Sequence, residues 1–316
     1  FTFYKIISNE LLEKILINKK IIYFRPLDIE LATGGCHFNK KCQKFKSQCN
    51  NCPKIVASNL IDLPTKNLIS KKKIFEKFKP RIFVQNNYVG KIFKSSNIFK
   101  NVQTYPVFIG TNTKRNKFYS KKVARQILKL DKNEKIILFG AFDLSSEIKG
   151  GHLLIRALNI LDKIVAKNSS DKIRLITIGK KNNFNLNTKK ILWSHFGIIS
   201  DNKKLNLIYR SADVLVCPSL YCFGPHIVTE ALLNDLPVVG FDLGVAQDTV
   251  INGVNGYLVP KYNNEIFAKS IYKTLFNKKN IKTNQKINKI KSFCSSEYET
   301  ETIINYSQKD LVRKSI

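Results

Sequence analysis

The stretch DVLVCPSLYCFGPHIVTEALLNDLPVVGFD, residues 213–242, decides the fold. It joins a continuous apolar run (DVLVCP) to a helical pattern (IVTEALLN) and then to a second apolar run (LPVVGFD). Apolar runs without alternation are typical of strands that are buried on both faces, and such strands separated by helices form parallel sheets. The stretch therefore predicts a strand, helix and strand of a parallel sheet, with a loop of Pro, Gly and aromatic residues before the helix.

The same alternation extends from residue 135 to the end of the chain. Further strands are predicted at 135–141, 172–179 and 191–198, and helices at about 150–167, 202–212, 263–276 and 299–314. The Asn- and Lys-rich stretch 277–289 is expected to be exposed. A parallel sheet covered by helices on both faces is a doubly wound α/β domain, which binds ligands at the carboxyl ends of its strands.

The first hundred residues are less regular. Two strand-like runs, 19–26 and 81–86, are too few for a whole domain, and the chain contains no Met. We therefore expect residues 1–105 to be the remnant of a first α/β domain whose beginning is absent, with a Cys-rich loop at 33–53. Residues 106–292 should form the ligand-binding domain, and 293–316 a helix that packs back toward the first domain.

The charge of the chain is strongly positive, at +31, but it comes from 46 Lys and only 8 Arg spread along the whole sequence. Specific nucleic-acid recognition favours Arg, and no nucleic-acid-binding motif is present. Most of these Lys are expected to be solvated surface residues, and attraction to anionic lipid or to an acidic substrate is the alternative. Because there is neither a run of 18 apolar residues nor a signal-peptide pattern, we expect a cytoplasmic protein.

The loop inside 213–242 has the features of an anion site. Gly224 lets the backbone approach a ligand closely, and Pro225 places the helix start at or after itself. The amides of residues 226–228 then point out of the helix N-terminus, where the helix dipole favours an anion. Glu230 lies near enough to accept hydrogen bonds from ligand hydroxyls. Alternatively, it is an acid that compensates the helix dipole, and this motif alone does not separate the two hypotheses.

Two other strand-to-helix turns add to the ligand hypothesis. Lys149 and Gly150 open the helix that follows the strand at 135–141, and a Lys at that sheet edge can neutralise a diphosphate. By itself this Lys would be a solvated residue at a helix start. Gly244 and the amide of Val245 offer backbone donors at a third turn.

Three segments and their order carry a resemblance to a known family, namely KIILFGA, KGGHLLIRAL and LIYRSADVLVCPSLYCFGPHIVTEALLNDLPVVGFDLGVAQDTVINGVNGYLV. In these segments the chain strongly resembles the retaining glycosyltransferases of family 4. The resemblance covers about Tyr105 to the end. It extends more weakly over 20–104 through TGGCHFNKKCQKFKSQCNNCP, which is similar to the Cys-rich loop of the colanic-acid or exopolysaccharide branch. It implies a GT-B fold, with two doubly wound Rossmann-like domains that face a cleft, the first one incomplete in this chain.

The resemblance also implies an activity and a site. A sugar would pass from a nucleotide-diphospho-sugar to a polysaccharide or lipid-linked glycan, with retention of configuration and no cofactor required for transfer. Lys149 would bind the diphosphate, Glu230 the nucleotide ribose, and residues 196–198 would border the base. The implied donor-binding residues are Lys149, Gly150, Phe196, Gly197, Ile198, Cys222, Phe223, Gly224, Pro225, His226, Ile227, Val228 and Glu230.

Three positions depart from the family pattern. Cys222 stands where a first glutamate is expected, Ala141 where an arginine often occurs, and Leu27 where relatives carry a histidine beside the acceptor. One explanation is a subfamily with catalytic residues of its own near Leu27, namely Asp28 and Glu30 together with Arg25. The other is a truncated or catalytically impaired relative, and the sequence leaves both open.

The Cys-rich loop raises a separate question. Cys36, Cys42, Cys49 and Cys52 are spaced x5, x6 and x2, with His37 adjacent. The spacing fits a structural zinc site, although a single CxxC is less specific than a pair. Reduced, partly buried cysteines fit equally well.

Two function classes compete with sugar transfer. A nucleotide-dependent oxidoreductase needs G-x-G-x-x-G after its first strand, and LFGAFDLSSEIKGG lacks that spacing. A basic nucleic-acid- or membrane-binding protein would act through charge alone. The hypothesis that combines these features is a cytoplasmic enzyme whose Lys-rich surface contacts the anionic inner face of the membrane near a lipid-linked acceptor.

Overall fold

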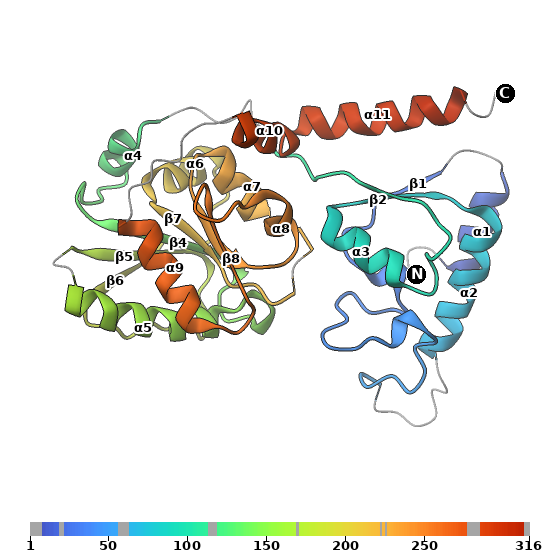
Figure 1. The fold of residues 1–316 in the computed structure, drawn as a ribbon, viewed down its shortest axis with the longest axis horizontal. Helices are drawn as coiled ribbons and strands as arrows, with labels where there is room; N and C mark the ends of the chain where they lie inside the picture. The colour runs from blue at the N-terminus through green and yellow to red at the C-terminus, as the bar shows by residue number, and fades with distance from the viewer. Residues whose placement is uncertain are drawn as a thin grey trace. The chain divides into compact units, whose positions relative to one another are not determined.

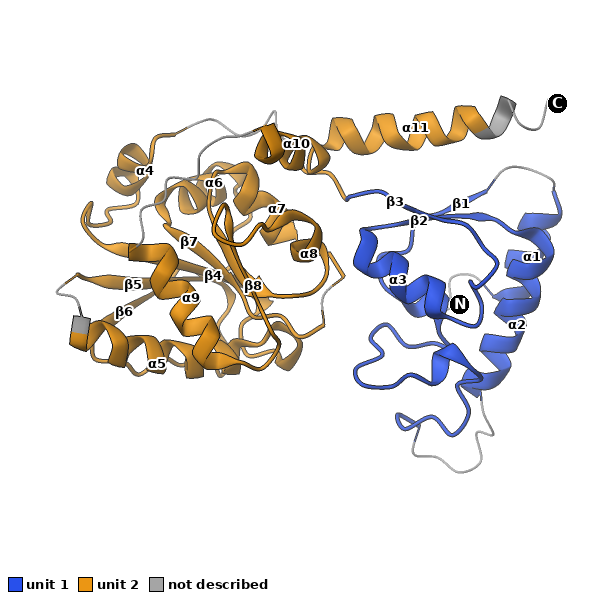
Figure 2. Cartoon of the chain, in the orientation of Figure 1, with its two compact units in different colours: residues 1–108 blue, residues 109–316 orange. Residues whose placement is uncertain are grey.

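The structure is a computed structural model of the 316-residue chain, and it describes residues 8–18, 22–55, 63–112, 119–168, 171–221, 223–224, 226–276 and 285–312. The chain divides into two compact units, residues 1–108 and 109–316 (Figure 2). The boundary expected from the sequence, after residue 105, falls three residues earlier, inside the strand Thr104–Pro106. Each unit has its own parallel sheet.

The first unit contains a three-stranded sheet in the order β1-β2-β3, with every pair parallel. Its strands are β1 (Tyr23–Phe24), β2 (Arg81–Val84) and β3 (Thr104–Pro106), and its helices are α1 (Asn9–Ile17), η2 (Glu30–Ala32), η3 (Lys44–Lys46), α2 (Leu63–Phe78) and α3 (Asn87–Ser95). Both strand-like runs of the sequence yield strands, although residues 19–21 lie outside the described part of the chain. Phe75, Phe83, Phe93 and Phe99 are fully buried and form the centre of this unit.

The second unit contains a six-stranded sheet in the order β6-β5-β4-β7-β8-β9, and every strand pair is parallel. The strands are β4 (Lys135–Asp143), β5 (Ile173–Lys180), β6 (Ile191–His195), β7 (Val214–Cys217), β8 (Val238–Phe241) and β9 (Gly256–Val259). All four residues of β7 and all four of β8 are buried, as their unbroken apolar runs predict.

Helices cover both faces of this sheet (Figure 1). α5 packs against α9, and α4 packs against α6. Because crossovers between parallel strands are right-handed, connections that run in opposite directions from the middle of the sheet place their helices on opposite faces. The helices are α4 (Lys121–Ile127), η5 (Glu147–Lys149), α5 (Gly151–Asn168), α6 (Asn202–Ser211), α7 (His226–Leu233), α8 (Val245–Thr249), α9 (Asn264–Phe276), α10 (Gln285–Phe293) and α11 (Ser296–Val312). The predicted α/β fold with parallel sheets is confirmed.

One local prediction is confirmed for most of the residues that can be compared. Within the stretch expected to be exposed, Gln285, Lys286, Asn288 and Lys289 are exposed, but they belong to α10, where Ile287 is 2% exposed; Ile290, just after the stretch, is 7% exposed. These apolar residues are three positions apart and so lie on one helix face, which the surrounding Asn and Lys obscure in the sequence. Residues 277–284 of that stretch lie outside the described part of the chain.

The C-terminal helix α11 is anchored at its start to the segment that enters the second unit. The Thr111 amide donates to the Cys294 carbonyl at 2.8 Å, and the Gly110 amide donates to Glu299 Oε2 at 2.7 Å. These contacts lie within the second unit. The expected packing of this helix toward the first domain therefore stays a prediction.

Candidate functional site

The strand order reverses between β4 and β7, which lie side by side with Ile137 opposite Val214. From β4 the chain crosses through α5 to β5, and from β7 it crosses through α7 to β8 on the other side. In open α/β sheets, ligands bind at the carboxyl ends of the strands where the order reverses. The loops that follow β4 and β7 therefore flank the expected ligand position.

These two loops are joined directly. The Leu220 amide, after β7, donates to the Ile148 carbonyl, after β4, at 2.9 Å. Gly150 has φ = +73°, and a Cβ built on it would lie 1.9 Å from the Pro218 carbonyl oxygen. Only glycine allows this backbone conformation and this approach together. The segment of Lys149 and the loop before α7 are therefore neighbours in the structure, although Lys149 and Pro218 are 69 positions apart in the sequence.

The N-terminus of α7 is the expected anion site. The helix begins at His226, which is exposed, followed by half-buried Ile227 and buried Val228. The first amides of a helix have no partner within it, and they carry the positive end of its dipole. Before the helix, Phe223 is buried and Gly224 is half-buried, whereas the predicted residues Cys222 and Pro225 lie outside the described part of the chain.

Lys149 adds a full positive charge at this edge. Its side chain is half-buried at the end of η5. Its amide donates to the Ser146 carbonyl at 3.0 Å, and its ammonium makes no hydrogen bond or ion pair with the described residues. A cation of this kind, beside a helix N-terminus, suits a diphosphate group.

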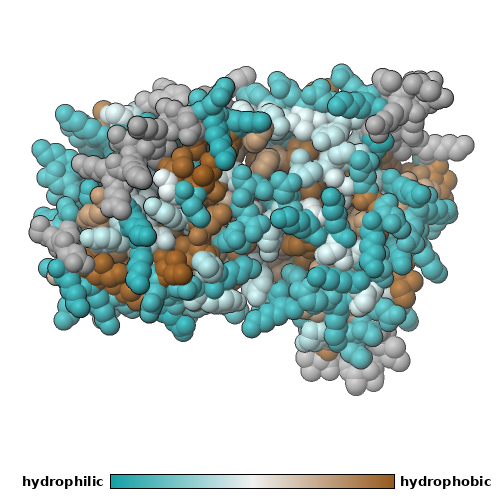
Figure 3. Space-filling model, viewed as in Figure 1, coloured by the Kyte–Doolittle hydropathy of each residue, from teal (hydrophilic) through white to brown (hydrophobic). Residues whose placement is uncertain are grey.

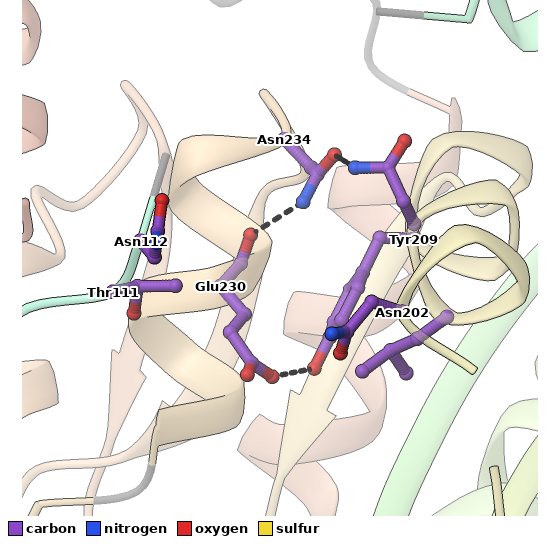
Figure 4. Close-up of a pocket in the computed structure, with 8 residues that line it drawn as sticks. Thr111, Asn112, Asn202, Tyr209, Glu230 and Asn234 are labelled. Carbon is purple, nitrogen blue, oxygen red and sulfur yellow. Dashed lines mark hydrogen bonds between the residues drawn. The ribbon is translucent and has the colours of Figure 1, made fainter. Parts of the chain in front are cut away.

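Glu230 lies one turn into α7 and lines a cavity of about 150 Å³ (Figure 4). The Tyr209 hydroxyl, from α6, donates to Glu230 Oε2 at 2.5 Å. Burial, and then the neighbouring Glu230 charge, raise the pKa of Tyr209 well above its usual value, so the phenol keeps its proton. The cavity is lined by Thr111, Asn112, Asn202, Leu205, Asn206, Tyr209, Glu230 and Asn234.

Sequence reasoning missed the other residues of this cavity. Asn234 Nδ2 donates to the Glu230 carbonyl at 2.9 Å, and Asn206 Nδ2 donates to Asn234 Oδ1 at 2.9 Å. Of these two asparagines, only Asn234 lies in the stretch 213–242 from which the site was predicted. Asn206 and Tyr209 come from the preceding helix, and no spacing rule links them to partners that lie 28 and 21 positions later.

The predicted base-binding residues lie at the same edge of the sheet but outside this cavity. Phe196, Gly197 and Ile198 follow β6, and the Phe196 amide donates to the Thr177 carbonyl at 2.9 Å. The strand predicted at 191–198 therefore ends at His195, and its last three residues form a loop. Ile198 is 61% exposed there, which leaves an apolar side chain in reach of a ligand.

In the first unit, the two candidate catalytic acids have different surroundings. Glu30 is buried, and its Oε1 accepts from Lys71 Nζ at 2.6 Å, so this carboxylate forms a structural ion pair. Asp28 Oδ2 lies 2.7 Å from His37 Nδ1, and its Oδ1 accepts from the Glu30 amide. Arg25, the third candidate of this segment, donates to the Val107 and Phe108 carbonyls.

The Cys-rich loop surrounds a cavity of about 390 Å³ that all four cysteines line. They are free thiols. Burial raises the pKa of the Cys36 and Cys49 thiols, which favours their neutral form. Among the residues that the structure describes, no three His, Cys, Asp or Glu side chains are arranged to hold a metal ion. The structural zinc stays a prediction from spacing, and a metal analysis of the purified protein tests it.

The model of the family "Glycosyl transferases group 1" matches residues 120–292, more than half of the chain. The matched segment contains Lys149, the α7 N-terminus and Glu230. The chain belongs to the group 1 glycosyl transferases. The sequence-based prediction of a glycosyltransferase is therefore confirmed at the level of the family.

Solved structures give the same fold for this group 1 glycosyltransferase. Sucrose-phosphate synthase from Thermosynechococcus elongatus is 18% identical with a TM-score of 0.65, covering 96% of this chain and 72% of that chain. Anabaena Alr3699/HepE in complex with UDP is 16% identical with a TM-score of 0.60, covering 98% and 77%. A glycosyltransferase from Rickettsia africae ESF-5 is 18% identical with a TM-score of 0.58, covering 77% and 67%. The fold is that of the GT-B glycosyltransferases.

A comparison with curated protein sequences finds no significant match. Among the described helices, none combines the length and the apolar character that a bilayer crossing needs.

Proposed function

We propose that this glycosyltransferase moves a sugar from a nucleotide-diphospho-sugar to a polysaccharide or lipid-linked glycan acceptor, with retention of configuration. The observation that carries the proposal is the constellation at the β4–β7 switch point. There a backbone hydrogen bond joins the connection after β4, which contains Lys149, to the loop that leads into α7, and α7 carries Glu230, which lines a cavity. The solved structures of Alr3699/HepE, one in complex with UDP and another with UDP-glucose, support a nucleotide-sugar donor.

The chain's residues would act mainly through charge. In the transfer, the bond between the sugar C1 and the diphosphate oxygen breaks, and a bond forms between C1 and an acceptor hydroxyl oxygen. Lys149 and the amides at residues 226–228 stabilise the negative charge that develops on the leaving diphosphate. Glu230 accepts a hydrogen bond from a ribose hydroxyl and thereby orients the nucleoside.

We further propose membership of family 4, close to the colanic-acid branch, on the resemblance of the Cys-rich loop and of the segment after Tyr105. A cytoplasmic enzyme in contact with the anionic inner face of the membrane fits the Lys-rich composition. Hydrophilic side chains cover most of the face in Figure 3, with small apolar patches between them. Co-sedimentation with vesicles that contain phosphatidylserine, which should weaken between 50 and about 300 mM salt, tests this contact.

The donor site is tested by thermal-shift screening against UDP-, GDP- and ADP-sugars, followed by calorimetry with the best ligand. Glu230→Ala should weaken nucleotide binding by about 1–3 kcal/mol because it removes a hydrogen-bonded acceptor. Lys149→Ala should weaken diphosphate binding more than nucleoside binding. Glu265→Ala is the matched control, because it removes an exposed acid from the first turn of α9. It shows the effect of losing an acid that only compensates a helix dipole, which is the alternative hypothesis for Glu230. Equal affinities for Glu230→Ala, Glu265→Ala and the unchanged protein would contradict the assignment.

A second candidate, a relative that binds the donor without transferring sugar, is supported by Leu27. This residue stands where relatives carry a histidine, and its side chain is 70% exposed and apolar. Donor binding without sugar release or transfer, measured by chromatography of the nucleotide products, would favour this candidate. In that case Cys222→Glu, which introduces the acid that the family pattern expects, should raise the transfer rate.

A further inference from the structure

The side chain of Tyr209 is directed at Glu230 from a neighbouring helix. Tyr209 lies in α6 and is 3% exposed, and its hydroxyl donates to Glu230 Oε2 at 2.5 Å (Figure 4). A buried polar group must find a partner, and a neutral phenol beside a carboxylate can stabilise it only by donating. The hydrogen bond therefore has a fixed direction, from Tyr209 to Glu230.

This contact divides the Glu230 carboxylate into two unequal oxygens. Oε2 is occupied by the phenol, whereas Oε1 has no hydrogen-bond partner among the described residues. The carboxylate lines the same cavity of about 150 Å³ as Asn202 and Asn206. A carboxylate oxygen can only accept a hydrogen bond, so a ligand group that meets Oε1 must be a donor, such as a hydroxyl.

We propose that Tyr209 is a positioning residue for the donor: it occupies Oε2 of Glu230 and thereby presents Oε1 as the acceptor for a ribose hydroxyl. The inference rests on the proposed function and adds a residue and a selectivity to it. A glutamate held in place before the ligand arrives does not pay the entropy of ordering when the ligand binds. The site therefore discriminates ribonucleotides from deoxyribonucleotides, and the discrimination depends on Tyr209.

The test compares Tyr209→Phe with the unchanged protein by calorimetry, using UDP and the UDP analogues that lack the 2′ or the 3′ hydroxyl; GDP and ADP sets are used if they bind more tightly. The ring stays in the core, and only the hydroxyl is lost. Tyr209→Phe should weaken UDP binding roughly three- to tenfold, which corresponds to the cost of ordering one side chain. The affinity for the analogue that lacks the recognised hydroxyl should not change. The ratio of the dissociation constants of this analogue and UDP should therefore fall toward one.

Two further variants separate positioning from general structural damage. Tyr272→Phe makes the same chemical change on α9, outside the cavity, where the ring packs against Phe276, and it should leave all affinities unchanged. In a Glu230→Ala background, Tyr209→Phe should have no further effect on UDP affinity, because its only route to the ligand has been removed. Thermal unfolding of each variant establishes that the proteins compared are folded.

The outcomes distinguish this inference from the proposed function. A loss of affinity that is equal for UDP and both deoxy analogues, or a further loss in the Glu230→Ala background, would overturn the positioning role of Tyr209. Unchanged binding by Tyr209→Phe together with weak binding by Glu230→Ala would also overturn it, while the donor site would stand. If no nucleoside diphosphate binds the unchanged protein, the proposed function itself is wrong.

Discussion

At the residue scale, the clearest example of a polar group with a structural role is Lys71. Its side chain is 1% exposed, and its ammonium donates to Glu30 Oε1 at 2.6 Å and to the Glu30 and Thr33 carbonyls at 2.9 and 3.1 Å. Burial lowers the pKa of Lys71, and the charge of Glu30 opposes that shift. The pair holds the segment that carries Asp28 and so determines where a candidate catalytic acid lies.

Removing the charge of Lys71 should therefore be costly. Lys71→Met leaves the Glu30 carboxylate buried without its cation, and we expect the free energy of unfolding to fall by about 3–5 kcal/mol. Lys77→Met is the matched control, because Lys77 pairs with Glu13 at 2.8 Å but both side chains are exposed, and it should cost less than about 1 kcal/mol. Urea unfolding measures both. Similar losses of unfolding free energy in the two variants would show that burial does not increase the contribution of Lys71 to stability.

Cys294 gives a prediction about pH. Burial raises the pKa of this thiol to about 12, whereas in the unfolded chain it stays near the ordinary value of 9.0. Below pH 9 the thiol is neutral in both states, and its burial contributes fully to stability. Between pH 9 and 12 the unfolded state loses the proton that the folded state keeps, so stability falls as the pH rises.

The slope from this one group should approach about 1.4 kcal/mol per pH unit. Urea unfolding under reducing conditions from pH 8 to 10 measures it as the difference between the unchanged protein and Cys294→Ala, because groups such as Tyr209, whose pKa is also raised, contribute equally to both. Cys294→Ala should be less stable at pH 8 but should lose less stability on going to pH 10. Parallel curves for the two proteins would mean that Cys294 is not the group that titrates.

At the element scale, the close approach of the loops after β4 and β7 brings together the elements of the proposed donor site. Gly150 and Gly253 have almost the same left-handed backbone, with φ of +73° and +75°. A Cβ on Gly150 would meet the Pro218 carbonyl, whereas a Cβ on Gly253 would meet nothing within 4 Å. The two positions therefore separate backbone strain from steric contact.

Gly253→Ala should cost about 1–2 kcal/mol of stability from strain alone. Gly150→Ala should add a further cost of about 1–3 kcal/mol from the clash, and it should weaken nucleotide binding because it pushes the two loops apart. Chemical unfolding and calorimetry with UDP measure the two effects. Nucleotide affinity that falls equally in both variants would show that the loop contact does not shape the site.

At the scale of the whole molecule, the charge of +31 has a consequence that no single contact shows. Like charges repel one another in the compact state, and salt screens that repulsion within a Debye length of about 10 Å at 0.1 M. The midpoint of thermal unfolding should therefore rise between 20 mM and about 300 mM sodium chloride. Differential scanning fluorimetry measures it, and a midpoint that falls over this range would mean that attractive ion pairs outweigh the repulsion.

Much of the second unit could be predicted from the sequence because its strands are buried on both faces. Runs such as KIILFGA and DVLVC have no alternation, and the position of Glu230 in the first turns of α7 follows from the Gly and Pro before it. The short strands of the first unit and helix α10 were harder to predict. There the apolar residues are few, and Lys and Asn surround them, so the local pattern is weak.

Only some residues of the candidate site could be predicted from the sequence. Lys149 and Glu230 could be named because each follows a strand at the sheet edge where ligands bind. Tyr209, Asn206 and His37 could not, because their roles depend on partners from other elements or turns. For Glu30, predicted as a catalytic acid, nothing in the sequence indicated the ion pair that it forms with the buried Lys71.

The sequence by itself determined the parallel α/β fold, the family and the two loops that carry Lys149 and Glu230, because apolar runs, glycines and helix starts act over a few neighbouring residues. Only the tertiary structure decided which polar groups are available to a ligand. That choice depends on hydrogen bonds between residues that are not neighbours in the chain. Tyr209 occupies one oxygen of Glu230 and leaves the other without a hydrogen-bond partner among the described residues, and Lys71 occupies Glu30 while Asp28 pairs with His37. Burial makes each such pairing strong, and burial is a property of the packed elements rather than of any single segment.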